Sequence, residues 1–104
     1  MSLNSEVQQK IERAKKENLT ELDLSVRGYW LAENDDKKLT QIPVEVFELQ
    51  QLKVLNLRGN SIPEIPEQIN QLRNLKSLNL SSNQLSKIPK SLENLTNLTS
   101  LDLL

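Results

Sequence analysis

Few side chains of this sequence could do chemistry, and their types and spacing exclude the common catalytic and metal sites. The 104 residues include no His and no Cys, which removes His-based acid–base catalysis and the usual zinc ligands. The two glycines, Gly28 and Gly59, stand too far apart to form a phosphate-binding loop. Asn34, Asp35 and Asp36 are consecutive and lack the spacing of a calcium-binding loop. We therefore predict that the chain is not an enzyme and has no catalytic residues, no metal and no cofactor.

The leucines, by contrast, recur with a period of 23 residues. The segment LKVLNLRGNSIPEIPEQINQLRN at 52–74 is followed by LKSLNLSSNQLSKIPKSLENLTN at 75–97, and the same frame begins again as LTSLDLL at 98–104. In the L-x-L part of each frame, alternate residues of a strand point to opposite sides, so the leucines share one face. One repeat buries too little apolar surface to be stable alone, so the repeats must stack on one another.

The pattern L-x-x-L-x-L-x-x-N-x-L resembles the leucine-rich repeat family, and the I-P-x-x-I half resembles its 23-residue, mostly intracellular subtype. The resemblance covers about residues 19–104. It implies an α/β solenoid with short parallel strands on the concave face and an irregular or short-helical convex face. The asparagines of the pattern, Asn60 and Asn83, are structural in this interpretation. Their side chains carry both a donor and an acceptor, so they can bond the backbone where the chain turns off the strand.

A helix and four stacked segments account for the whole chain. Residues 1–18 should form an N-terminal capping helix, because Val7, Ile11 and Ala14 fall at i, i+4 and i+7 on one stripe. Asn18 can end this helix in a left-handed conformation. A helix that binds a membrane or a partner is the alternative interpretation. The repeats are then predicted at 19–51, 52–74 and 75–97, with an incomplete fourth repeat at 98–104.

The first repeat is ten residues longer than its neighbours. With LTELDL as its strand, the excess falls at 25–38, before the convex return that begins with LTQIP. A second alignment stays open, in which Tyr29-x-Leu31-x-x-Asn34 supplies the strand. We expect Tyr29, Trp30 and Leu31 to shield the core at the edge of this repeat. The alternatives are an aromatic anchor for a partner, since Tyr and Trp are enriched in interface hot spots, and simple exposure to solvent.

Partners of leucine-rich repeat proteins usually meet the outward strand residues of the concave face, and the resemblance implies the same here. The surface is polar and small-sided, and suits hydrogen bonds to a protein or peptide; solvation without a partner is the alternative. Carried over position by position, the partner-binding residues are Glu21, Asp23, Ser25, Val54, Asn56, Arg58, Ser77, Asn79, Ser81, Ser100 and Asp102. A formal net charge of −1 gives no basis for a nucleic-acid partner, and no apolar run is long enough to span a bilayer.

We therefore predict a protein-interaction module, and the absence of cysteine and of an apolar leader favours a cytoplasmic location. The alternative is a regulatory or dimerisation arm of a larger GTPase. An amphipathic helix followed by LTELDLS and LTQIP resembles the opening of repeat arrays in bacterial Roco-type multidomain signalling proteins. The frame stops in the strand half of a repeat at Leu104. We accordingly expect a fragment of a longer protein, whose uncapped last repeat could self-associate.

Overall fold

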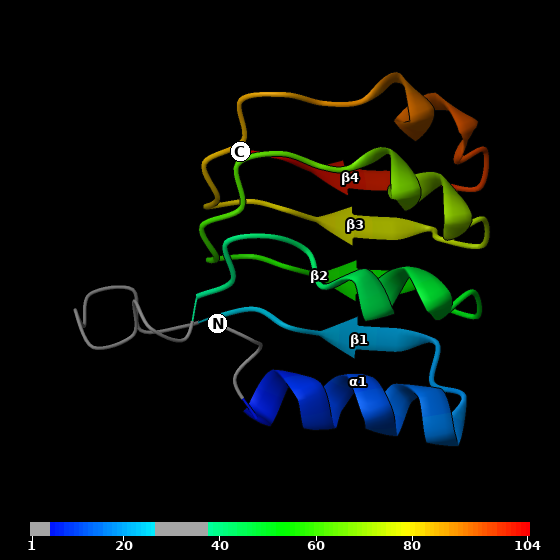
Figure 1. The fold of residues 1–104 in the computed structure, drawn as a ribbon. Coiled ribbons are helices and arrows are strands. Elements are labelled where there is room, and N and C mark those ends of the chain that lie inside the picture. Colours follow the sequence, from blue (N-terminus) through cyan, green and yellow to red (C-terminus); the bar gives the residue numbers. More distant parts are fainter. Residues whose placement is uncertain (1–4, 27–37) are drawn as a thin grey trace.

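The structure, a computed structural model, describes residues 5–26 and 38–104. Four short strands form one parallel sheet in the order β1-β2-β3-β4, and the helix α1 lies beside β1 at one end of the stack (Figure 1). The strands are β1 Glu21–Asp23, β2 Val54–Asn56, β3 Ser77–Asn79 and β4 Ser100–Asp102. This arrangement confirms the solenoid predicted from the repeats.

The register passes from strand to strand without a slip. Leu22 pairs with Leu55, Leu55 with Leu78, and Leu78 with Leu101. Because side chains alternate along a strand, this register is the one that puts every central leucine on the same face. The strand beside β2 is therefore supplied by LTELDL, and the alternative strand frame that begins at Tyr29 lies outside the described residues.

The core lies between the sheet and the convex returns. In the second repeat Leu52, Leu55, Leu57, Ile62 and Ile69 are all 0% exposed. On the convex side each return makes one 3₁₀-helical turn directly after a proline (Figure 1). Proline suits this place because its fixed φ matches a first helical turn and its missing N–H would be unpaired there. The three turns are η2 Val44–Glu48, η3 Glu67–Gln71 and η4 Lys90–Asn94.

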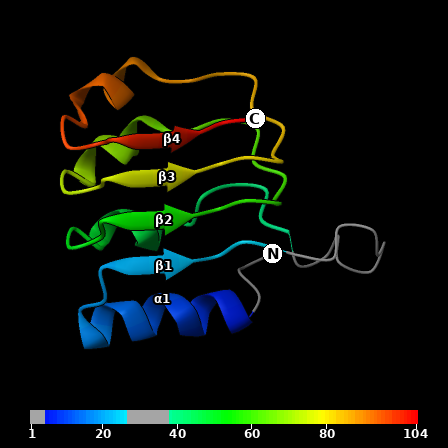
Figure 2. The same ribbon diagram turned by 180° about the vertical axis from the view of Figure 1, so that it is seen from behind.

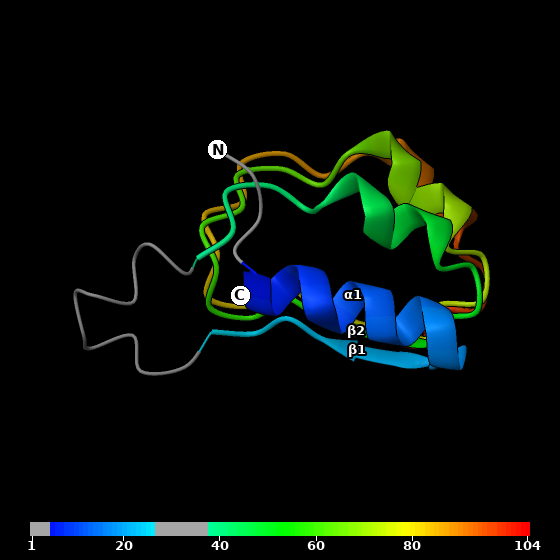
Figure 3. The ribbon, with the colours of Figure 1, turned by 60° about the horizontal axis from the view of Figure 1, so that its bottom comes forward.

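The helix α1, Ser5–Glu17, closes the end of the stack next to β1. Figure 3 shows it between β1 and the convex turns. Its predicted stripe is buried, with Val7 at 8%, Ile11 at 5% and Ala14 at 0% exposure. Asn18 follows with a φ of 54°, and Leu19 N–H donates to Ala14 C=O at 2.9 Å. The predicted capping helix is therefore confirmed, and no helix in the described ranges is both long and apolar enough to cross a membrane.

Candidate protein-binding face

The predicted partner-binding residues form three rows across the concave face of the sheet. No described helix or 3₁₀ turn lies in front of this face in Figure 2. The strand register defines the outer row and the Asx row, and the turn row follows two residues after the Asx row. The outer row is Glu21, Val54, Ser77 and Ser100; the Asx row is Asp23, Asn56, Asn79 and Asp102; the turn row is Ser25, Arg58 and Ser81.

Each side chain of the Asx row accepts a hydrogen bond from the backbone two residues further on. Asp and Asn form this local turn readily, because their short side chains reach the second following N–H. The N–H of Ser25 donates to Asp23 Oδ1 at 2.9 Å, and the N–H of Arg58 donates to Asn56 Oδ1 at 3.0 Å. The N–H of Ser81 donates to Asn79 Oδ1 at 2.9 Å, and the N–H of Leu104 donates to Asp102 Oδ1 at 3.3 Å. The row thus fixes the end of every strand, a role that the sequence analysis missed.

The sequence does carry a signal for this role. An Asp or Asn stands at the same place in all four strands, and in two of them the residue two positions later is a Ser whose hydroxyl joins the bond. Asp23 Oδ1 accepts from the Ser25 hydroxyl at 2.6 Å, and Asn79 Oδ1 accepts from the Ser81 hydroxyl at 2.7 Å. Ser81 is only 7% exposed, so this predicted contact residue has little surface to offer a partner.

These bonds decide which donors and acceptors of the concave face remain available to a partner. Since Oδ1 of Asn56 and of Asn79 is occupied, their amides leave the Nδ2 donors for a partner in the middle of the row. Carboxylates stand at its two ends, on Asp23 and Asp102. Arg58 is exposed and is the only basic residue of the three rows. The face can therefore offer both donors and acceptors, but its rows contain no aromatic side chain.

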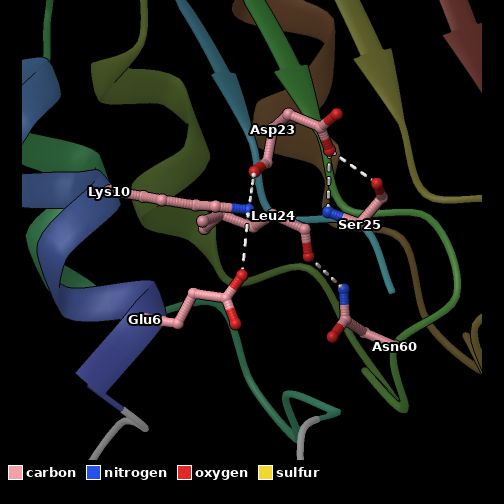
Figure 4. Close-up of polar contacts among 6 residues, drawn as sticks. All are labelled: Glu6, Lys10, Asp23, Leu24, Ser25 and Asn60. Carbon is pink, nitrogen blue, oxygen red and sulfur yellow. Dashed lines mark hydrogen bonds and ion pairs between the residues drawn. The ribbon is translucent and has the colours of Figure 1, made fainter. Parts of the chain in front are cut away.

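Asn60 and Asn83 bond the backbone in both directions at the turns. Asn60, 3% exposed, donates through Nδ2 to the C=O of Leu24 and of Leu57 at 3.0 Å each. Its Oδ1 accepts from Leu39 N–H at 2.7 Å, and Figure 4 shows the bond to Leu24. Asn83 makes the equivalent bonds one repeat later. Each amide therefore joins its own repeat to the preceding one.

Tyr29, Trp30 and Leu31, which we expect to shield the core or alternatively to anchor a partner, lie outside the described residues. The described residues on either side of this segment both bond the second repeat near the turn row. Val26 N–H donates to Arg58 C=O at 2.9 Å, and the return starts at the Leu39 N–H that Asn60 holds. Gly59, with a φ of 79°, packs so tightly here that a Cβ would overlap the carbonyl oxygen of Val26. The space at this end of the sheet therefore requires glycine.

Within residues 5–26 and 38–104, no three His, Cys, Asp or Glu side chains gather in a way that could hold a metal ion. The carboxylates of the concave face are instead spread along the strands. The described side chains of this face can therefore form hydrogen bonds and ion pairs with a partner.

Comparison with known proteins gives the chain a family. A family model described as a leucine-rich repeat region matches residues 17–104. Among solved structures, a leucine-rich repeat protein of Leptospira interrogans is similar, at 34% sequence identity and a TM-score of 0.65. That match covers 85% of this chain and 26% of that chain, so this chain spans only a part of its length. No curated protein matches. Because the family model extends from the end of α1 through β4, the chain belongs to the leucine-rich repeat family.

Proposed function

We propose that the chain is a protein-interaction module that binds a protein or peptide, or another domain of a longer protein, through the concave face. Leucine-rich repeat domains are in general protein-interaction modules, and this chain belongs to the leucine-rich repeat family. The observation that carries the proposal is the alignment of the three rows across the concave face. Polar side chains stand in register across four strands, with no described element in front of them (Figure 2).

The exposed side chains that hold no turn are the ones to substitute in a test of binding. Glu21, Arg58 and Ser100 are exposed, and no other described residue bonds their side-chain ends, whereas the oxygens of the Asx row hold the turns. Adjacent strands lie about 4.8 Å apart, so a partner that crosses the sheet meets a new side chain at each strand. Substitutions in the outer row and at Arg58 change this surface without removing a turn.

The experiment uses a peptide selected against the wild-type chain from a random library. Isothermal titration would then compare its affinity for wild type, Glu21→Lys, Arg58→Glu and the double variant. We expect at least a tenfold loss for the double variant. Lys90→Glu is the matched control, because Lys90 is exposed on η4 at the convex side, and it should bind as wild type does. Unchanged affinity in the double variant would refute the concave site.

The alternative function, a regulatory or dimerisation arm of a Roco-type GTPase, rests on the sequence of the opening segment alone. It predicts a G-x-x-x-x-G-K-[ST] motif further along the reading frame, and a frame without that motif would exclude it. A cytoplasmic location is also still a prediction. Fractionation of the source cells would check it.

A further inference from the structure

A pocket of about 280 Å³ lies between the first and the second repeat, beside the turns η2 and η3. Its walls come from residues 40–47 of the first convex return and from residues 63–68 of the second. The apolar part of the lining is Ile42, Val44, Phe47, Pro63 and Pro66. Pockets that enclose a drug-sized ligand usually have about 300–1,000 Å³. This pocket is at the low end of that range and suits one inserted side chain.

Val44 distinguishes this pocket from an ordinary hollow in the surface. It is 64% exposed, and within residues 5–26 and 38–74 it is the one large hydrophobic side chain that is exposed. It directly follows the proline of its return, where the second repeat has Glu67 and the third has Lys90. A lone exposed valine is ordinary, but Val44 shares the pocket with Ile42 and Phe47, each 3% exposed. A side chain that enters the pocket would therefore meet buried apolar groups.

The surface around the pocket is acidic. Residues 40–52 and 61–72, which form the first two convex returns, contain no Lys and no Arg. Their four carboxylates either line the pocket or directly adjoin a lining residue in the sequence, and all are exposed: Glu45, Glu48, Glu64 and Glu67. None of the four forms an ion pair within the described part of the chain, whose pairs lie in α1. Those pairs are Glu6–Lys10 at 3.8 Å (Figure 4) and Arg13–Glu17 at 3.1 Å.

The third repeat reverses this charge. Lys87 and Lys90 occupy the positions of Glu64 and Glu67, and the backbones of Glu64 and Lys87 lie side by side in a parallel bridge. The acidic surface therefore belongs to the first two repeats and is bordered by basic residues at the third. A partner with clustered positive charge would be attracted to the first two repeats and repelled by the third.

Two glutamines can hold the backbone of a bound peptide. Gln41 and Gln68 line the pocket from its two sides, and both are exposed. Neither side-chain amide bonds another described residue. Each amide offers two donors and an acceptor, which match the N–H and C=O groups of an extended chain.

We propose that this pocket and its acidic surround bind a basic peptide segment through one inserted aliphatic side chain. The inserted side chain packs against Val44, Ile42 and Phe47. Lysine or arginine residues on either side of it pair with the four carboxylates, and the two glutamines bond the peptide backbone. This site is on the convex side, so it is separate from the concave face and its occupant is a second partner.

Fluorescence anisotropy of three labelled five-residue peptides tests the proposal on the full chain at low salt. The first peptide has one leucine between two pairs of lysines, the second has glycine in place of the leucine, and the third has glutamates in place of the lysines. We expect saturable binding of the first, an affinity about tenfold or more lower for the second, and no binding of the third. Added salt should weaken the binding of the first peptide.

Substitution of Val44 tests the pocket itself. Val44→Ser should weaken binding of the leucine peptide by about threefold or more, because it removes an apolar wall, and should leave the glycine peptide unaffected. The matched control is Val54→Ser, the same substitution on the concave face, which should leave both peptides unaffected. Circular dichroism would verify that each variant is folded.

Substitution of the carboxylates tests the charge. Glu64→Lys with Glu67→Lys gives the second repeat the charges of the third, and should weaken binding of the leucine peptide by about tenfold or more. The matched control is Glu12→Lys with Glu93→Lys, which changes the net charge equally at exposed residues that do not line the pocket. This control should bind nearly as wild type does.

Four results would overturn the proposal. They are the absence of saturable binding, equal affinities of the leucine and glycine peptides, equal effects of Val44→Ser and Val54→Ser, and equal effects of the two double charge reversals. Peptide binding at the concave face is measured independently, with Glu21 and Arg58, so either proposal can fail without the other.

Discussion

Asn60 offers the sharpest test of how the repeats are held together. The substitution Asn60→Ala removes three hydrogen bonds from a site that is 3% exposed. One of the acceptors, Leu57 C=O, keeps a bond from Asn83 Nδ2 at 2.9 Å. The other two groups, Leu39 N–H and Leu24 C=O, lose the bonds described for them.

The magnitude follows from those two groups. A buried backbone group left without a partner costs about 1–3 kcal/mol, and taking about 1.5 kcal/mol for each gives a loss of about 3 kcal/mol. Domains of ordinary stability unfold with about 5–15 kcal/mol, so the variant should be severely weakened. Urea unfolding followed by far-UV circular dichroism would measure the free energy of unfolding.

Asn83→Ala is the matched control. Asn83 makes equivalent bonds but is half-buried, so water can replace part of what is lost. We expect its loss to be about 1–2 kcal/mol. If Asn60→Ala costs less than about 1 kcal/mol, or no more than Asn83→Ala, burial of the amide is not what makes the bond network important.

Three further predictions use the same unfolding measurement. Gly59→Ala should lower the free energy of unfolding by at least about 2 kcal/mol, because alanine would be strained at this left-handed φ and its Cβ would overlap the carbonyl oxygen of Val26. Ser82 stands at the equivalent position with a φ of 58°, and Ser82→Ala should lower it by about 0.5 kcal/mol or less. Equal losses in the two variants would contradict the overlap. Leu78→Ala should cost about 3 kcal/mol, and Leu101→Ala, 42% exposed, less than half as much in dilute solution. Lys10→Met should cost less than about 1 kcal/mol, because that side chain is 43% exposed, and a loss that grew with added salt would contradict its ionic part.

The stacked sheet was predictable because one period governs most of the chain. Each repeat places its leucines on the same face, so the register could be written down from the spacing alone. The first repeat was ambiguous, since Tyr29-x-Leu31 matches the same local pattern as Leu22-x-Leu24. The end of α1 explains why Leu22-x-Leu24 forms a strand. The helix closes at Asn18, which delivers the chain directly into β1.

The chemistry of the concave face was less predictable. Spacing shows that the side chains of Asn56 and Asn79 face outward, but not whether their oxygens meet solvent or their own backbone. Both arrangements fit the same sequence, and the local backbone angles select one of them. The distinction matters for function, because it leaves Arg58 and Glu21 as the freely exposed charges and makes the Asx row part of the scaffold.

The bonds that Asn60 and Asn83 make to the preceding repeat also set the order in which the molecule comes apart. Each of these bonds joins neighbours only, so loss of one layer does not require loss of the next but one. The layer at β4, which has no buried strand residue, should open first, and the layers nearest α1 last. Amide hydrogen exchange should therefore slow progressively from residue 104 back toward β2. The repeats would then open at different rates along the stack, although their sequences are almost the same.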